Sequence, residues 1–193
     1  MRQHIRDFIG KCAEYWDLPE PIYEFGSMAE GQAPDMVDLR TMFPGKDYTR
    51  TDLRNGDNVD VVLDLHNIEL PDESVGTAIC VETLEHVRYP WIAIEELCRV
   101  LKPQGVVIVT SCMHFPIHEH PHDYWRFTPD GLRVLMEIFE ASWVDIAGDP
   151  AFPHTVAGIG WKEGELPHDI DAFGKDLDEH WIMRTMERGS ACE

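Results

Sequence analysis

The chain has 193 residues, of which 44% are hydrophobic and 27% are charged, with 36 acidic against 16 basic side chains and a formal net charge of −20. This length and composition predict one globular domain and exclude a predominantly disordered chain. The excess of acid excludes nucleic acid and anionic lipid as general partners, because their phosphates would be repelled, and it favours a small cationic ligand.

Neither a membrane helix nor a secretory signal is predicted. No stretch approaches the roughly 18 uninterrupted apolar residues that cross a bilayer. Residues 1–7 lack the apolar run of a signal peptide. The five cysteines are scattered and form no CxxC pair, which favours reduced thiols. We therefore expect a cytoplasmic protein with no integral membrane segment.

The N-terminal half alternates helical and β-prone stretches. In chain order they are a helix within residues 1–18, a strand at 22–25, a helix at 35–43, and strands at 48–52, 59–65 and 75–81. The last two strands are dense apolar runs, which predict parallel strands buried on both faces.

The C-terminal half continues the alternation. In chain order it shows a helix at 90–101, a strand at 106–110, a helix at 128–139, strands at 143–147 and 155–159, and a helix at 176–187. Thr128 and Pro129 are a typical N-cap and first helical residue. Residues 161–193 form an acidic extension of the single domain, which we expect to act as a lid or as the contact of a homodimer.

Strands alternating with helices predict an α/β fold with a mostly parallel sheet and helices on both faces, a three-layer sandwich. The short stretch from residue 52 to residue 59 leaves no room for a helix between the second and third strands. In such sheets a ligand binds outside the carboxyl ends of the strands. The residues that directly follow each strand are therefore the candidate site.

Acidic residues stand at three of these strand ends. Asp52 follows the second strand and suits ribose hydroxyls, which donate to a carboxylate. Asp64 and Leu65 follow the third and suit an adenine, through its amino group and its ring. Glu82 follows the fourth, and Gly26 provides a tight turn after the first. We expect the acids to converge on one nucleoside.

Three motifs carry a resemblance to a known family. LEHV at 84–87 and RVLKPQG at 99–105 resemble the class I S-adenosylmethionine-dependent methyltransferases of the type 11 group, and DYWRF at 123–127 is similar to one of its subgroups. The resemblance covers roughly residues 20–145. It implies a seven-stranded Rossmann-like fold, S-adenosylmethionine as cofactor and methyl transfer as the activity.

Carried over position by position, the resemblance assigns a set of residues to the cofactor: Glu24, Gly26 and Ser27 near its methionine end, Asp52 at the ribose, Asp64 and Leu65 at the adenine, and Glu82 beside the methionine. Two features depart from the family. Met28 stands where a second glycine of the loop is expected, and Gly31 comes late, so the carboxylate end of the cofactor is held differently or weakly. The usual helix between strands two and three has no room between Asp52 and Val59.

The histidine-rich loop after the fifth strand faces the acceptor in this fold. We expect His118 or His120 to be the general base and Tyr124 and Trp125 to help wall the acceptor pocket. Arg126 pairs with a phosphate or carboxylate of the acceptor or, alternatively, forms an internal ion pair. The histidines have a structural alternative too. A metal site is a third interpretation, but no HExxH is present and we assign no metal.

The predicted function is methyl transfer to an O or N atom of a small-molecule acceptor, for example a sugar or a lipid headgroup. A non-catalytic S-adenosylmethionine-binding protein, or a methyltransferase-like partner subunit, is the alternative that the altered glycine loop keeps open. The missing GxGxxG argues against an NAD-dependent oxidoreductase.

Overall fold

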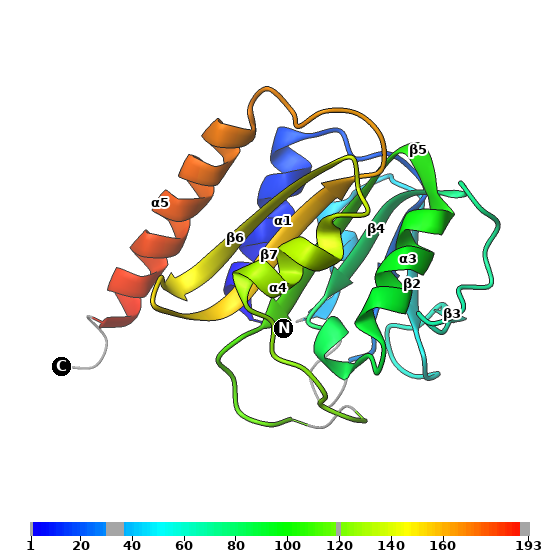
Figure 1. Ribbon diagram of the computed structural model, residues 1–193, viewed down its shortest axis with the longest axis horizontal. Helices are drawn as coiled ribbons and strands as arrows, with labels where there is room; N and C mark the ends of the chain where they lie inside the picture. The colour runs from blue at the N-terminus through cyan, green and yellow to red at the C-terminus, as the bar shows by residue number, and fades with distance from the viewer. Residues whose placement is uncertain (1, 30–36, 119–120, 190–193) are drawn as a thin grey trace.

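A single sheet forms the centre of the molecule (Figure 1). The computed structural model describes residues 2–29, 37–118 and 121–189. Within these residues seven strands lie in the order β3-β2-β1-β4-β5-β7-β6, and only β7 runs antiparallel to its neighbours. The strands are β1 (Ile22–Phe25), β2 (Tyr48–Asp52), β3 (Val61–Val62), β4 (Val75–Val81), β5 (Leu101–Cys112), β6 (Ala141–Asp149) and β7 (Phe152–Trp161).

Helices cover both faces of the sheet, as the sequence predicts. The described helices are α1 (Gln3–Tyr15), α3 (Pro90–Val100), α4 (Pro129–Met136) and α5 (Ile170–Gly189), with short 3-10 helices η1 (Arg40–Met42) and η2 (Leu84–His86). Helices α3 and α4 pack on one face, and α1 and α5 on the other (Figure 1). The fold is therefore the predicted three-layer α/β sandwich.

The buried side chains follow the periodicities seen in the sequence. Along β4, Ala78 and Cys80 pack in the core with α3 and α4, while Ile79 and Val81 pack in the core with α1 and α5. Thr128 caps α4 as predicted, because its Oγ1 accepts a hydrogen bond from the Gly131 N–H at 3.1 Å.

The third strand differs from its prediction. The run 59–65 was expected to be a buried strand, but only Val61 and Val62 are extended, and their side chains are 44% and 50% exposed. The prediction was wrong because β3 is an edge strand. Residues 53–74, all described, contain no helix to cover it.

Other boundaries moved too, among them the start of the last helix, which was predicted at residue 176 and lies at Ile170. The strand predicted at 106–110 begins at Leu101, which pairs with Val75 before a register shift at the bulge. The helix predicted over 35–43 lies partly outside the described residues, and its described part ends in η1.

The C-terminal extension is anchored to the N-terminal helix. Phe173 and Leu177 of α5 are fully buried in the core that α1 shares, and Trp181 is 7% exposed there. Of the helices in the described chain, none combines the length and the apolar character needed to cross a membrane. The roles of lid and dimer contact stay predictions.

Candidate functional site

A cavity of about 490 Å³ opens at the carboxyl ends of β1, β2 and β4, where α/β sheets bind ligands. Its size is typical of small-molecule sites. Every residue that the sequence assigns to the cofactor lines it: Glu24, Gly26, Ser27, Asp52, Asp64, Leu65 and Glu82. The structure brings these side chains together from four separate segments of the chain.

The turn after β1 requires glycine. Gly26 has φ of +82°, and a Cβ there would lie 2.7 Å from Thr83 Cγ2 and closer still to Thr83 Oγ1. Thr83 is itself held, because its Oγ1 donates to the Val81 carbonyl at 2.9 Å. The turn and the end of β4 therefore touch at the cavity wall, without room for any larger residue.

Met28, which stands where the family loop has its second glycine, packs its side chain against Gly56. Its side chain lies so close to Gly56 that a Cβ on Gly56 would be 2.7 Å from Met28 Sδ. The Met28 N–H points to Asp52 Oδ2 at 3.4 Å, and Ser27 Oγ donates to the Asn58 carbonyl at 2.7 Å. The altered loop is thus fastened to the segment that follows β2.

The two candidate nucleoside acids have different surroundings. Asp52 is 11% exposed, and its Oδ1 accepts the Arg54 N–H at 2.9 Å. Asp64 is 47% exposed, and its Oδ1 lies 2.8 Å from both the His66 backbone nitrogen and His66 Nδ1. The Tyr89 N–H donates to His66 Nε2 at 3.3 Å, so His66 carries its proton on Nδ1 and donates it to Asp64. These hydrogen bonds fix the orientation of both carboxylates at the cavity wall.

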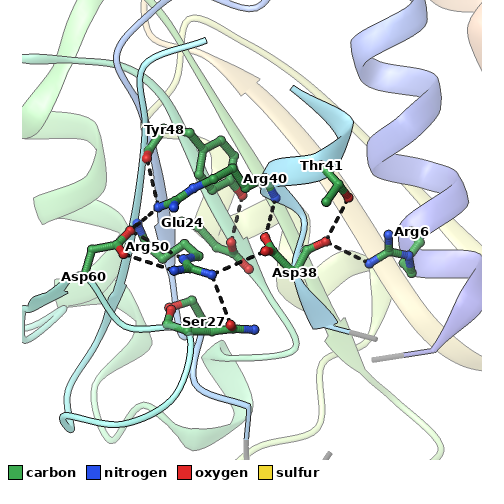
Figure 2. Close-up of polar contacts among 10 residues, drawn as sticks. Arg6, Glu24, Ser27, Asp38, Arg40, Thr41, Tyr48, Arg50 and Asp60 are labelled. Carbon is green, nitrogen blue, oxygen red and sulfur yellow. Dashed lines mark hydrogen bonds and ion pairs between the residues drawn. The ribbon is translucent and has the colours of Figure 1, made fainter. Parts of the chain in front are cut away.

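The carboxyl of Glu24 belongs to a network of polar contacts that joins β1, β2 and the segments beside them (Figure 2). Glu24 is 2% exposed and accepts a hydrogen bond from the Tyr48 hydroxyl at 2.8 Å. Burial raises the pKa of Glu24 to about 7, although the Tyr48 hydrogen bond lowers it. Arg50 reaches Asp60 at 3.1 Å and Asp38 at 3.4 Å in the same network. Glu24 thus lines the cavity, but its carboxyl is bound by the scaffold.

Glu82 is paired with a cation from the start of the chain. Arg2 Nε donates to Glu82 Oε2 at 3.0 Å, and the Arg2 guanidinium lies 5.0 Å from the centroid of the Phe115 ring. Arg2 and Phe115 line the cavity too. Sequence reasoning missed both, because no local signal connects Arg2 with residues 80 and 113 positions away.

The opposite end of the cavity is built from η2 and the loop after β5. The Glu85 carbonyl accepts the N–H groups of Tyr124 at 2.8 Å and Trp125 at 3.2 Å, and His86 Nδ1 lies 2.5 Å from the His122 carbonyl. These hydrogen bonds therefore fix the loop after β5 to η2. His86 also lines the cavity.

His118 lines this end and is oriented by a buried acid. Its Nδ1 lies 3.2 Å from Asp123 Oδ2, and its backbone N–H donates to the same oxygen at 2.8 Å. Asp123 is 2% exposed and receives Arg126 Nη2 at 2.7 Å. The Arg126 guanidinium thereby holds the pKa of Asp123 well below its usual range. The second candidate base, His120, lies outside the described residues.

The three residues assigned to the acceptor stand back from the cavity, since none is among its lining residues. Tyr124 is 44% exposed, and Trp125 is 37% exposed with its Nε1 donating to the Val87 carbonyl at 3.0 Å. Arg126 forms the internal ion pair that the sequence analysis offered as its alternative.

Comparison with known proteins identifies the class of this fold. Residues 41–109 match the family model of a methyltransferase domain. No curated protein matches the chain. Among solved structures, an S-adenosylmethionine-dependent methyltransferase of Archaeoglobus fulgidus is similar with a TM-score of 0.63 and 12% identity, over 84% of this chain and 95% of that one.

Two further solved structures share the fold. One is an S-adenosylmethionine-dependent methyltransferase of Thermotoga maritima, with a TM-score of 0.57 and 20% identity over 83% of this chain and 91% of that one. The other is the 1,6-didemethyltoxoflavin-N1-methyltransferase of Burkholderia thailandensis, which holds 1,6-didemethyltoxoflavin and S-adenosylhomocysteine. It has a TM-score of 0.59 and 14% identity, over 81% of this chain and 77% of that one.

Proposed function

We propose that the chain is an S-adenosylmethionine-dependent methyltransferase, in line with the matching family model and the shared fold, and that it methylates an oxygen or nitrogen atom of a small-molecule acceptor bound beside His118. The observation that carries the proposal is one shared cavity. Its lining includes both the candidate nucleoside contacts and a histidine that is oriented by Asp123.

The candidate nucleoside contacts fit the cofactor. Asp52 and Asp64 supply carboxylate oxygens for ribose hydroxyls and an amino group, and Leu65 supplies an apolar surface for a base. Gly26 leaves the turn bare of a side chain, which lets a ligand approach the backbone. Acidic groups at this edge also suit a cationic ligand electrostatically. The carboxyl of Glu24 instead joins β1 to β2 through its hydrogen bond with Tyr48.

When bound, S-adenosylmethionine supplies a methyl group on a cationic sulfur for an in-line displacement, which depends mainly on alignment and desolvation. Phe115 and Pro121 contribute to the wall near His118 and so limit water there. Arg2 holds Glu82 in place at the cavity wall. These residues position reactants rather than react.

His118 is the proposed general base. The Pro116 carbonyl and the Asp123 carboxylate, 3.1 and 3.2 Å from Nδ1, can only accept a hydrogen bond, so the proton of the neutral ring is on Nδ1 and Nε2 is the basic nitrogen. A positioned base contributes about 10²–10⁴-fold to transfer onto a hydroxyl and less onto a neutral amine. The choice of acceptor atom therefore sets how much His118 matters.

Calorimetry tests the cofactor half of the proposal. We expect S-adenosylhomocysteine to bind the full chain and NADH not to bind. Absence of heat with S-adenosylhomocysteine contradicts the proposal. Transfer of tritiated methyl groups to a panel of alcohols and amines then identifies the acceptor.

Substitution of His118 tests the catalytic half. We expect His118→Asn to lower the rate of methyl transfer to a hydroxyl acceptor by about 10²-fold and to leave S-adenosylhomocysteine affinity intact. His168→Asn, an exposed histidine outside the cavity, is the matched control. Full activity of His118→Asn on a hydroxyl acceptor contradicts the base assignment.

A further inference from the structure

Three side chains of metal-binding type lie close together, and two of them, His86 and His118, line the cavity. Glu85 and His86 belong to η2, and His118 comes from the loop after β5. Each offers one ligand atom, and these three atoms lie within 4.8 Å of one another. The rings of His86 and His118 are edge to face, with centroids 4.8 Å apart.

Both histidine rings are oriented through Nδ1. His86 Nδ1 lies 2.5 Å from the His122 carbonyl, and His118 Nδ1 lies 3.1 Å from the Pro116 carbonyl and 3.2 Å from the Asp123 carboxylate. Since these oxygens can only accept, each neutral ring carries its proton on Nδ1 and its lone pair on Nε2. Metal-binding histidines are held by such hydrogen bonds to a carbonyl or carboxylate.

Glu85 supplies an independent observation. Its side chain is 0% exposed, and Ser111 Oγ donates to Oε2 at 2.6 Å. The other oxygen, Oε1, is buried with no hydrogen-bond partner among the described residues. An unsatisfied buried carboxylate oxygen is unfavourable, so it favours a bound cation or proton.

We propose that Glu85, His86 and His118 bind one divalent transition-metal ion where the two histidines line the cavity. Two imidazoles and a carboxylate suit Zn²⁺, Co²⁺ or Fe²⁺ better than Mg²⁺ or Ca²⁺, which prefer oxygen ligands. Metal–ligand distances near 2.1 Å separate tetrahedral ligands by about 3.4 Å. On metal binding, the three ligand atoms must therefore approach one another by about an ångström.

The site has a consequence for catalysis. A metal ion bound to His118 occupies the lone pair of Nε2. This nitrogen then cannot take the proton from the methyl acceptor, so the metal-loaded protein loses its general base. We expect Zn²⁺ to inhibit methyl transfer to a hydroxyl acceptor. The metal site itself does not depend on the proposed function, because binding is measured without cofactor or acceptor.

Cobalt absorption tests the site in the full, untagged chain. We expect one equivalent of Co²⁺ to give visible ligand-field bands that Zn²⁺ abolishes. Glu85→Gln, His86→Asn and His118→Asn should each weaken cobalt binding at least tenfold, while His168→Asn leaves it unchanged. Glu85 is buried, so its variant can fail to fold. The test therefore depends on comparing cobalt binding by His118→Asn with that of wild type, because the native His118 side chain is 24% exposed.

Two results overturn the site: no ligand-field band in the wild-type chain, or cobalt binding by His118→Asn equal to that of wild type. An equal loss in His168→Asn overturns it as well, since binding is then diffuse. Calorimetry with S-adenosylhomocysteine on the same samples separates this failure from that of the proposed function. A chain that binds the nucleoside but no cobalt loses only the metal site.

Discussion

Both ends of the cavity bury a glutamate, but they satisfy it differently. Glu24 lines the cavity, and Glu85 precedes the lining residue His86, with 2% and 0% of their surface exposed. Burial raises the pKa of both, to about 7 and about 8. The two carboxyl groups therefore share a cost of desolvation and differ in what surrounds them.

The surroundings of Glu24 are closely tied together. Tyr48 donates to it, and Arg40 and Arg50 connect the same network to Asp60, so β1, β2 and the segment before β3 are cross-linked (Figure 2). Glu85 has Ser111 as its side-chain donor and one oxygen without a partner in the described chain. A satisfied network supports a scaffold, whereas an unsatisfied group at a cavity wall is available for chemistry.

The largest effect is expected at the nucleoside end, from Gly26→Ala. Both Gly26 and Gly45 have positive φ, +82° and +81°, but only Gly26 is crowded by Thr83. Left-handed alanine costs about 1 kcal/mol and overpacking adds about 3 kcal/mol. We expect Gly26→Ala to lower the free energy of unfolding by about 4 kcal/mol and Gly45→Ala by about 1 kcal/mol.

Urea denaturation measures both variants. Equal destabilisation of the two would show that the contact with Thr83 is unimportant and that backbone strain alone governs the turn. It would also weaken the view that the nucleoside end is rigid.

The next effect is the pH dependence that Glu24 contributes. Its folded pKa of about 7 lies above the ordinary 4.5, so from pH 4.5 to 7 the unfolded chain releases a proton that the folded chain keeps. Stability therefore falls as pH rises through this window and is level above it. The fall amounts to about 3 kcal/mol, from 1.36 kcal/mol per pKa unit.

Glu24→Gln cannot ionise, so we expect its unfolding free energy to lack this part of the fall. Urea titrations at several pH values between 4.5 and 7.5 measure the difference from wild type. Glu69→Gln removes an exposed carboxyl and serves as the control. Identical pH slopes for wild type and Glu24→Gln would mean that Glu24 ionises normally.

The sequence predicted the central strands well because their limits are local. Strands 22–25, 48–52 and 75–81 have the bounds of β1, β2 and β4. Proline, glycine or an acid marks most of their ends. Strand 59–65 failed because its burial depended on a covering element, and no helix lies within the described residues 53–74 to provide it; such cover is a tertiary property.

The site was predictable where a strand end determines position. The seven residues assigned to the cofactor all line the cavity, because carboxyl ends of parallel strands share one edge. Glu85 stood in a recognised motif, but its burial depends on Ser111 and the rest of the core, which no spacing reveals. Arg2 reaches Glu82 only because α1 packs across the sheet.

A smaller effect is expected for cofactor affinity in Asp52→Ala. Loss of charge-assisted hydrogen bonds should weaken S-adenosylhomocysteine binding by about 2 kcal/mol, roughly 30-fold. Asp57→Ala removes the same charge from an exposed position in the same segment and should leave affinity nearly unchanged. Calorimetry measures the affinity of each variant for S-adenosylhomocysteine. If both variants lose affinity equally, long-range charge rather than direct contact explains the effect.

The smallest effect compares the two buried glutamates directly. Tyr48→Phe and Ser111→Ala each remove one donor from a buried carboxyl, and each should cost about 1 kcal/mol of unfolding free energy. Cobalt then distinguishes the ends, because a ligand that binds only the folded chain stabilises it. We expect cobalt to stabilise Tyr48→Phe as much as wild type and Ser111→Ala less, since Ser111 orients the Glu85 ligand. Equal stabilisation of both variants by cobalt would show that Glu85 is as much a part of the scaffold as Glu24.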